Sequence, residues 1–453
     1  MTGQVLSRRR SGVLLPASAL RQDGRGAFGA PATRFIDWLA DAGFSVWQLL
    51  PLVPTDTSGS PYWARSDRAG GAELTDAAAP DPGDDGDLDA YCAANAHWLD
   101  DFTLFEALSQ EQGGAPWWKW PTPLRQRDAT ALAAARRRLA PRLTQLARMQ
   151  WRFDGQWEAL RRHADARGVK IFGDLPIYVA PDSVAAWVSP EAFQLRADGE
   201  AVAVSGVPPD YFSEDGQLWG NPLYDWDAQR RSGFRFWLQR LALQADRFDL
   251  LRIDHFRALE AYWAVPAGAK TAREGQWRAA PGRDLLTRVR QQLPQLELVA
   301  EDLGVITPEV TALRREFGLP GMRVLQFGFD GDPANLHLPH EHAVDAVVYT
   351  GTHDNDTTVG WYAGLAHEAR DQVRRYLGRS DDDAVDALRR AALASVAVLA
   401  VLPVQDILHL GSEARLNRPG TASGNWSWRL PPPSLTPELA ARYRDMNQLY
   451  NRS

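Results

Sequence analysis

Charged side chains stand at the ends of several short apolar runs in this sequence, where buried β-strands would finish. Four acidic residues of this kind come from four separate runs, and arginine and histidine side chains accompany them. An unpaired carboxylate is costly to bury, and any single one of these acids could instead cap a helix or form a buried ion pair. Four together favour a catalytic site. The complete set is Asp174, Arg252, Asp254, His255, Glu301, Asp302, His353, Asp354 and Asp406.

Two carboxylates at one site can cleave a glycosidic bond. One attacks the anomeric carbon, the other donates a proton to the leaving oxygen, and a separation of about 5–5.5 Å gives retention of configuration. Arg252 lies two residues before Asp254, so both side chains point to the same side of a strand, and the cation should keep Asp254 ionised as a nucleophile. Glu301 follows the apolar residues 298–300, which predicts a raised pKa and an acid/base role.

Eight short apolar runs, separated by helical segments, would bring these side chains together. Such runs are typical of parallel strands buried on both faces. Eight strand–helix repeats predict an α/β fold, a closed (β/α)8 TIM barrel, with its catalytic groups at the C-terminal ends of the strands. The predicted strands are 12–16, 45–51, 169–178, 250–255, 296–302, 323–329, 346–352 and 400–406.

Two segments are too long for simple connections, so we expect one catalytic domain over residues 1–453 with two excursions. Residues 53–160, rich in Asp, Pro and Trp and then in Ala, Arg and Leu, predict an inserted, mostly helical subdomain. Residues 180–230 predict a long active-site loop region over the barrel mouth. A first helix is predicted to open at Thr33 as its N-cap, because apolar residues follow at helical spacing.

The composition is that of an ordinary globular protein, with 45% hydrophobic and 24% charged residues. A net charge of −7 without a long basic run argues against nucleic acid or an anionic membrane as a partner. The single cysteine, Cys92, fits a reducing compartment, and the sequence shows neither a signal-peptide pattern nor an 18-residue apolar run. These features predict a cytoplasmic protein, and we expect a monomer or a weak homo-oligomer.

Two weaker patterns point elsewhere and are set aside. Residues 24–29 fit G-x-G-x-x-G, but Leu49 stands where a dinucleotide site needs an acidic residue. The three histidines of HLPHEH (337–342) surround a proline and are typical of a solvated loop rather than a metal site. A metal-dependent hydrolase would need histidines at several strand ends, and only His255 and His353 qualify. We therefore expect no cofactor and no metal ion.

Four segments resemble the signature regions of the α-amylase superfamily, and the whole chain is similar to the amylomaltases, the 4-α-glucanotransferases of glycoside hydrolase family 77. The four segments are GDLPIYV (173–179), LLRIDHFR (250–257), LVAEDLG (298–304) and GTHDN (351–355). Further shared motifs are SPY (60–62), GQLWGNPLYDW (216–226), QDILHLGSEARLN (405–417) and GNWSWR (424–429). The similarity runs from about residue 12 to 429, and this order of motifs is far more specific than any one of them.

The resemblance implies a role for each of nine residues. Asp254 would be the nucleophile, Glu301 the acid/base, and Asp354 a third carboxylate that stabilises the distorted sugar and its oxocarbenium-like charge. Trp219 would stack at or next to the acceptor side. The other substrate-binding residues, around the cleaved glucose of a maltooligosaccharide or longer α-glucan, would be Tyr62, which stacks on the sugar ring, Asp174, Arg252, His255 and His353.

The same carboxylates could serve a transferase or a hydrolase, depending on whether a sugar hydroxyl or water attacks the glucosyl-enzyme. A transferase must hold an acceptor and exclude water. The segment 205–222, with Tyr211, Phe212 and Trp219, could act as a lid, which favours transfer. An α-glucan hydrolase and a non-catalytic glucan-binding protein stay open as alternatives, although the intact set of three carboxylates argues against the second.

One segment departs from the family pattern. After SPY the family usually continues into an AGNP element, whereas this chain reads WARSDRAGGAELTD, with Gly71 and Ala72 in place of Asn-Pro. An aromatic residue often seen shortly before SPY is also missing, and Thr57 stands near that place. We therefore predict a reshaped donor side, which would handle long glucans or large cyclic products differently.

Overall fold

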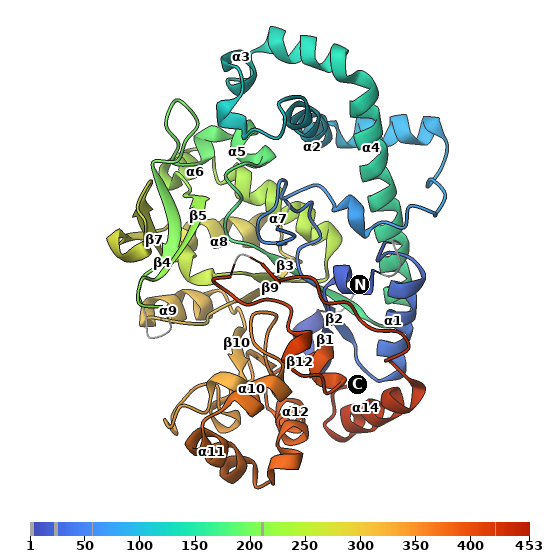
Figure 1. Ribbon diagram of the computed structural model, residues 1–453, viewed down its shortest axis with the longest axis vertical. Helices are drawn as coiled ribbons and strands as arrows, with labels where there is room; N and C mark the ends of the chain where they lie inside the picture. The colour runs from blue at the N-terminus through green and yellow to red at the C-terminus, as the bar shows by residue number, and fades with distance from the viewer. Residues whose placement is uncertain (1–3, 22–25, 57, 210–212, 422) are drawn as a thin grey trace.

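Eight parallel strands form the centre of the molecule (Figure 1). In the computed structural model, which describes residues 4–21, 26–56, 58–209, 213–421 and 423–453, they run in the order β10-β11-β12-β1-β2-β3-β6-β9. The two ends of this order meet, because the Ala300 N–H donates to the Pro320 carbonyl at 2.9 Å. The sheet is thus rolled into a (β/α)8 barrel, which confirms the predicted fold class.

Each of the eight predicted apolar runs contains or overlaps one barrel strand. Five of the strands, β2, β6, β10, β11 and β12, are buried at every residue, which explains why they stand out within apolar runs. All the strands except β1 are shorter than predicted, and β1 has the predicted length but begins two residues earlier. Their bounds are β1 (Arg10–Leu14), β2 (Val46–Gln48), β3 (Lys170–Leu175), β6 (Leu250–Ile253), β9 (Glu297–Ala300), β10 (Gly321–Val324), β11 (Ala346–Tyr349) and β12 (Leu399–Pro403).

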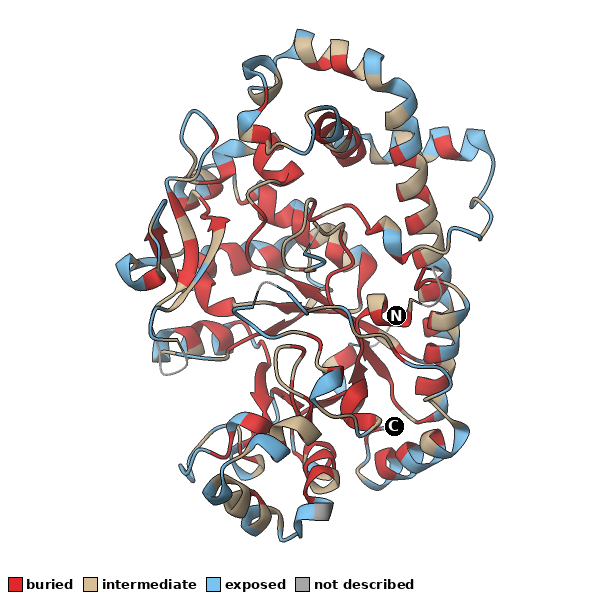
Figure 2. Cartoon of the chain, viewed as in Figure 1, coloured by how far each residue is buried: buried red, intermediate tan, exposed pale blue. Residues whose placement is uncertain are grey.

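Helices cover the outside of the barrel and bury one face each against it, as the red and blue faces in Figure 2 show. In α1 (Ala30–Asp41) the buried face includes Phe35 and Leu39. The helix begins four residues earlier than predicted: Gly29 is its N-cap, Pro31 lies in its first turn, and the Thr33 N–H already donates to the Gly29 carbonyl. The prediction of Thr33 as the cap was wrong because proline is itself a good first-turn residue. The other helices on the barrel are α7 (Arg235–Arg247), α8 (Gly282–Gln292), α9 (Pro308–Glu316), α10 (Thr358–Gly364), α11 (His367–Leu377), α12 (Ala384–Ala394), α13 (Val404–Ile407) and α14 (Pro437–Leu449).

Residues 53–160 contain mainly helix. The long helices α2 (Asp85–Glu111) and α4 (Ala129–Ala166) are joined by the short α3 (Thr122–Arg125), and α4 descends from this outer group to the barrel (Figure 1). The group has an aromatic core of its own, in which Phe105 and Trp120 pack on Trp187 from α5 (Val184–Val188). Within the described part of the chain, no helix is both long and apolar enough to cross a membrane.

Residues 180–230 form more regular structure than the predicted loop. They include α5, α6 (Trp226–Arg231) and the strands β4 (Ala203–Val207) and β5 (Gln217–Pro222). These strands join β7 (Ala261–Pro266) and β8 (Gln276–Ala279) in an antiparallel sheet of order β5-β4-β7-β8. The sequence hid this sheet because β4 pairs with a partner more than 50 residues away and its register with β5 shifts between Val204 and Gly206.

Gly173 in β3 is closely packed, which predicts that a larger side chain at this position destabilises the fold. A Cβ on Gly173, the residue before Asp174, would lie 2.4 Å from the ring of the buried Phe248. Gly173→Ala should therefore lower the free energy of unfolding by about 1–3 kcal/mol, as overpacked cores do. Urea unfolding measures this change. Gly364→Ala is the matched control, because no atom lies within 4 Å of its added Cβ in the described structure; equal losses in the two variants would contradict the prediction.

Candidate active site

The C-terminal ends of the barrel strands bring the predicted polar side chains together. Asp174 lies in β3 and Arg252 in β6. Asp254 and Glu301 directly follow β6 and β9, and the loop after β11 carries His353 and Asp354. Because parallel strands of a barrel all end at the same face, residues far apart in the sequence meet there.

Arg252 is the centre of a buried charge network. Its Nη1 donates to both carboxylate oxygens of Asp174, at 2.7 and 2.8 Å, and its Nη2 donates to Asp254 Oδ1 at 2.9 Å. The Tyr62 hydroxyl donates to Asp174 Oδ2 at 2.6 Å. The side chain of Asp174 is fully buried, whereas that of Asp254 is 28% exposed. Of the two carboxylates bonded to Arg252, Asp254 is thus the one that a substrate can reach.

Glu301 is held by the backbone around it. Its Oε2 accepts from the His255 N–H at 2.6 Å, and its Oε1 accepts from the Leu303 N–H at 2.9 Å. His255 has a φ of 50°, a left-handed conformation that points its N–H at Glu301. Backbone donors on both oxygens therefore orient this carboxyl group.

Burial, and after it the nearby Asp254, raise the pKa of Glu301 to about 7, against the lowering effects of Arg252 and of the two backbone N–H donors. This agrees with the raised pKa predicted from the apolar run before it. Burial also raises the pKa of Asp254, to about 6. Arg252 does lower the pKa of Asp254, as predicted, but desolvation outweighs it. The net shift of the Asp254 pKa is upward.

Asp354 has partners that favour its charged form. Burial alone would raise its pKa, but His353, whose Nε2 lies 3.3 Å from Asp354 Oδ2, and the Asn417 Nδ2, which donates to Oδ1 at 2.7 Å, bring it below the ordinary range. The Arg415 Nη2 also donates to the backbone carbonyl of Asp354 at 2.7 Å. Asn417 and Arg415 both come from the motif 405–417, and the sequence analysis gave neither of these two residues a role.

Aromatic side chains surround the polar cluster. The ring of Tyr62 stacks on that of His353 with centroids 5.2 Å apart, and Trp426 lies 6.0 Å from each of them. On β5, the Trp219 ring meets the His255 ring edge to face at 4.7 Å. The predicted substrate-binding residues are therefore in contact with one another or with the carboxylates. The predicted lid residues Tyr211 and Phe212, and Thr57, lie outside the described residues.

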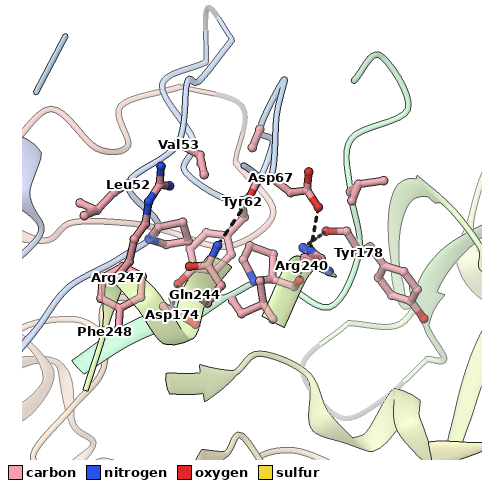
Figure 3. A pocket seen from close by; sticks show the side chains of 15 residues that line it. Leu52, Val53, Tyr62, Asp67, Asp174, Tyr178, Arg240, Gln244, Arg247 and Phe248 are labelled. Carbon is pink, nitrogen blue, oxygen red and sulfur yellow. Dashed lines mark hydrogen bonds and ion pairs between the residues drawn. The ribbon is translucent and has the colours of Figure 1, made fainter. Parts of the chain in front are cut away.

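A small cavity behind Tyr62 shows how its loop is attached to β3 (Figure 3). Arg240, from α7, is almost completely buried there. Its guanidinium donates to the carbonyls of Pro176 and Ile177 at 2.6 and 3.0 Å and forms an ion pair with Asp67 at 3.2 Å. This cavity is not lined by Asp254 or Glu301, so it belongs to the scaffold of the site. No sequence signal distinguished Arg240 from the many surface arginines.

The histidines of the segment 337–342 have partners within the protein. The Val324 N–H donates to His337 Nδ1 at 3.0 Å, and His342 Nδ1 lies 2.7 Å from Ser395 Oγ. His340 contacts the Tyr376 hydroxyl at 2.8 Å. Among the described residues, no group of three or more His, Cys, Asp or Glu side chains could hold a metal ion.

A (β/α)8 barrel whose strand ends gather three carboxylates, an arginine and stacked aromatic rings has the architecture of an α-amylase-type carbohydrate-active enzyme. A family model described as 4-alpha-glucanotransferase matches residues 15–79 and 72–436. The chain belongs to the 4-alpha-glucanotransferase family and is an enzyme of that class.

Individual relatives agree with this assignment. Proteins named 4-alpha-glucanotransferase from Thermus thermophilus and Synechocystis are 45% and 42% identical, over 98% and 99% of this chain and 99% of each relative. The solved structure of an amylomaltase from Streptococcus agalactiae, in complex with acarbose, is similar with a TM-score of 0.94 and 31% identity. That match covers 98% of this chain and 100% of the other.

This chain is shorter than its relatives. The alignment with the Thermus thermophilus protein runs over 495 positions, whereas the chain has 453 residues. The family model matches in two pieces that overlap at residues 72–79, next to the sequence that departs from the family pattern after Tyr62. Here the chain lies close to α4: Gly70 exchanges two hydrogen bonds with Gln150, and Asp76 exchanges two with Gln156.

Proposed function

We propose that this chain transfers α-1,4-glucan segments between maltooligosaccharides by a retaining double displacement at Asp254 and Glu301. The observation that carries the proposal is the unequal environment of the two carboxyl groups. Asp254 accepts a hydrogen bond from Arg252 and is reachable, while Glu301 is buried, has a pKa raised by that burial, and is aimed by two backbone N–H groups. A nucleophile and a general acid need this difference.

In the first half-reaction, an Asp254 carboxylate oxygen attacks the anomeric carbon of the donor. The bond from that carbon to the glycosidic oxygen breaks, and Glu301 gives its proton to this oxygen, which departs as the 4-hydroxyl of the leaving saccharide. Positive charge develops on the ring oxygen and the anomeric carbon, and the anionic Asp354 stabilises it. Tyr62 and His353 provide the aromatic surface that holds the sugar ring, and Arg252 fixes Asp174 and Asp254 relative to each other.

In the second half-reaction, the 4-hydroxyl of an acceptor sugar attacks the same carbon. Glu301, now a carboxylate, takes the hydroxyl proton, and Asp254 leaves. Trp219 and His255 offer an aromatic contact on the acceptor side. We infer that this aromatic surface favours attack by a sugar hydroxyl over attack by water.

We also propose that the chain acts on glucan substrates as a cytoplasmic monomer or weak homo-oligomer.

Incubation with maltotriose tests the proposed reaction. Transfer predicts free glucose together with a series of longer maltooligosaccharides, separated by chromatography and identified by mass. Maltose and glucose without longer products would contradict transfer and indicate a hydrolase. An unchanged substrate would contradict enzymatic activity on α-1,4-glucans altogether.

The pKa values predict the pH dependence of this reaction. The active form has Asp254 ionised and Glu301 protonated, so kcat/KM should rise as pH passes the Asp254 pKa, about 6, and fall as it passes the Glu301 pKa, about 7. Because the two carboxyl groups interact, the rising and falling sides of the pH profile report apparent pKa values of the pair rather than of either residue alone. Initial rates from acidic to alkaline pH, on both sides of these two values, measure the profile. A rate that stays constant across that whole range would contradict the assigned protonation states.

A further inference from the structure

Asp406 is a strand-end acid that the proposed mechanism does not use. It lies in α13, directly after β12, and is completely buried. A carboxylate in such a place needs hydrogen-bond donors to offset its loss of water. The described donors to its carboxylate oxygens come from the two ends of the loop that carries His353 and Asp354.

Three hydrogen bonds make this connection. Thr350, the residue after β11, donates its hydroxyl to Asp406 Oδ2. Thr358, the first residue of α10, donates its backbone N–H to Asp406 Oδ1 at 2.7 Å and its hydroxyl to Oδ2 at 2.6 Å. Both threonines are buried, at 1% and 0% exposure. The Asp406 carboxylate therefore links Thr350 and Thr358, the two residues that flank the segment 351–357.

Asp406 is itself held in place by the barrel wall. The Arg389 Nη1, from α12, donates to the Asp406 carbonyl at 2.6 Å, and the same nitrogen lies 3.3 Å from the Tyr443 hydroxyl of α14. Arg389 is 3% exposed. The backbone of Asp406 is thus held by Arg389 of α12, which also contacts Tyr443 of α14, while the Asp406 carboxylate is hydrogen-bonded to the two ends of the loop.

We propose that Asp406 is a positioning residue that clamps both ends of the 351–357 loop and so fixes Asp354 at the reacting sugar. This inference rests on the role proposed above for Asp354. The clamp differs from the contacts of Asn417 and Arg415, which touch Asp354 itself. Asp406 acts on the spacing of the loop ends, and a displacement of a catalytic group by about 1 Å can cost about 100-fold in rate.

The charge and the shape of Asp406 can be separated by two substitutions. Asp406→Ala removes both carboxylate acceptors and leaves three buried donors without a partner. Asp406→Asn keeps an oxygen for the Thr358 N–H, and its amide can donate to the hydroxyl oxygens of Thr350 and Thr358. We expect Asp406→Ala to lower kcat on maltotriose by about 100-fold with KM changed by less than about threefold, because Asp354 acts most strongly in the transition state. The kcat of Asp406→Asn should be at least about tenfold higher than that of Asp406→Ala.

A control variant distinguishes positioning from stability. Asn447, from α14, is equally buried and polar, and it donates to the Ala42 carbonyl far from the loop. Asn447→Ala should lower the melting temperature as Asp406→Ala does, while its kcat, measured well below both melting temperatures, stays within about twofold of the wild type. Equal values of kcat for Asp406→Ala and Asn447→Ala would overturn the proposal.

Two further sets of variants test the clamp, one at the threonines and one at Asp354. If Asp406→Ala does not fold, Thr350→Val and Thr358→Val each remove one hydroxyl donor; a lowered kcat in either variant supports the clamp, whereas wild-type kcat in both overturns it. Asp354→Asn separates the two proposals. If Asp354→Asn is fully active, the role of Asp354 fails. If it is inactive while Asp406→Ala is normal, only the clamp fails.

Discussion

Asp254→Asn should reduce transfer from maltotriose by at least about 10⁴-fold, the scale seen when a nucleophile is removed from an intact catalytic set. The asparagine amide can still accept a hydrogen bond from Arg252 Nη2, so the charge network should persist. It cannot form a stable ester with the anomeric carbon, so neither half-reaction can proceed. Purified variant and wild-type proteins compared at equal concentration, by the release of glucose, measure the loss.

The same substitution should leave the fold intact. Burial raises the pKa of Asp254, which means that the folded state disfavours its negative charge. A neutral side chain of the same shape should therefore melt no lower than the wild type at a pH above this raised pKa of about 6. Asp227→Asn, an exposed acid in the first turn of α6, is the control for the loss of a charge. Turnover retained by Asp254→Asn would remove Asp254 from the nucleophile's role.

Glu301→Gln should lower kcat on maltotriose by about 10²–10⁴-fold, because general acid catalysis contributes about that much. The loss should depend on the leaving group. With α-maltosyl fluoride as donor, the departing fluoride needs no proton, so the first half-reaction should recover much of its rate. The second half-reaction still lacks its base and becomes the slow step. Fluoride release in the first turnover and in the steady state measures the two halves separately.

Asp302 supplies the matched control for this variant. It is the next residue in the chain and is also buried, but its Oδ1 accepts from the Met322 N–H at 2.6 Å and lies near Arg323. Asp302→Asn should therefore retain catalysis even if it lowers stability. An equal loss of the first-turnover rate with maltotriose and with the fluoride would contradict the acid/base assignment of Glu301.

Much of the barrel and of the cluster could be predicted because both depend on local patterns. A parallel strand that is buried on both faces must be a short apolar run, and a polar residue that follows it must lie at the barrel's open end. Asp254 and Glu301 follow this pattern directly. The same reasoning identified Asp406, but one sequence could not show that this acid faces two threonines rather than the substrate.

The rest depends on contacts between distant segments. Arg240 connects the loops around Asp67 and Pro176, and nothing near it in the sequence indicates that it is buried. Asn417 is more than 60 residues from Asp354, to which it donates. The pKa of Asp254 was predicted from one neighbour, Arg252, whereas its net shift is set by burial, which the sequence does not quantify.

The central claim is that Asp254 forms a covalent bond to the donor sugar. Glu301→Gln incubated with α-maltosyl fluoride should accumulate this species, since the fluoride leaves without an acid and the return step lacks a base. Mass spectrometry of the intact protein, followed by peptide mapping, is the most direct measurement. We predict a mass increase of one maltosyl group, located on the peptide that contains Asp254. A label on Asp354 or on any other peptide, or fluoride release that continues from an unlabelled protein, would contradict the account.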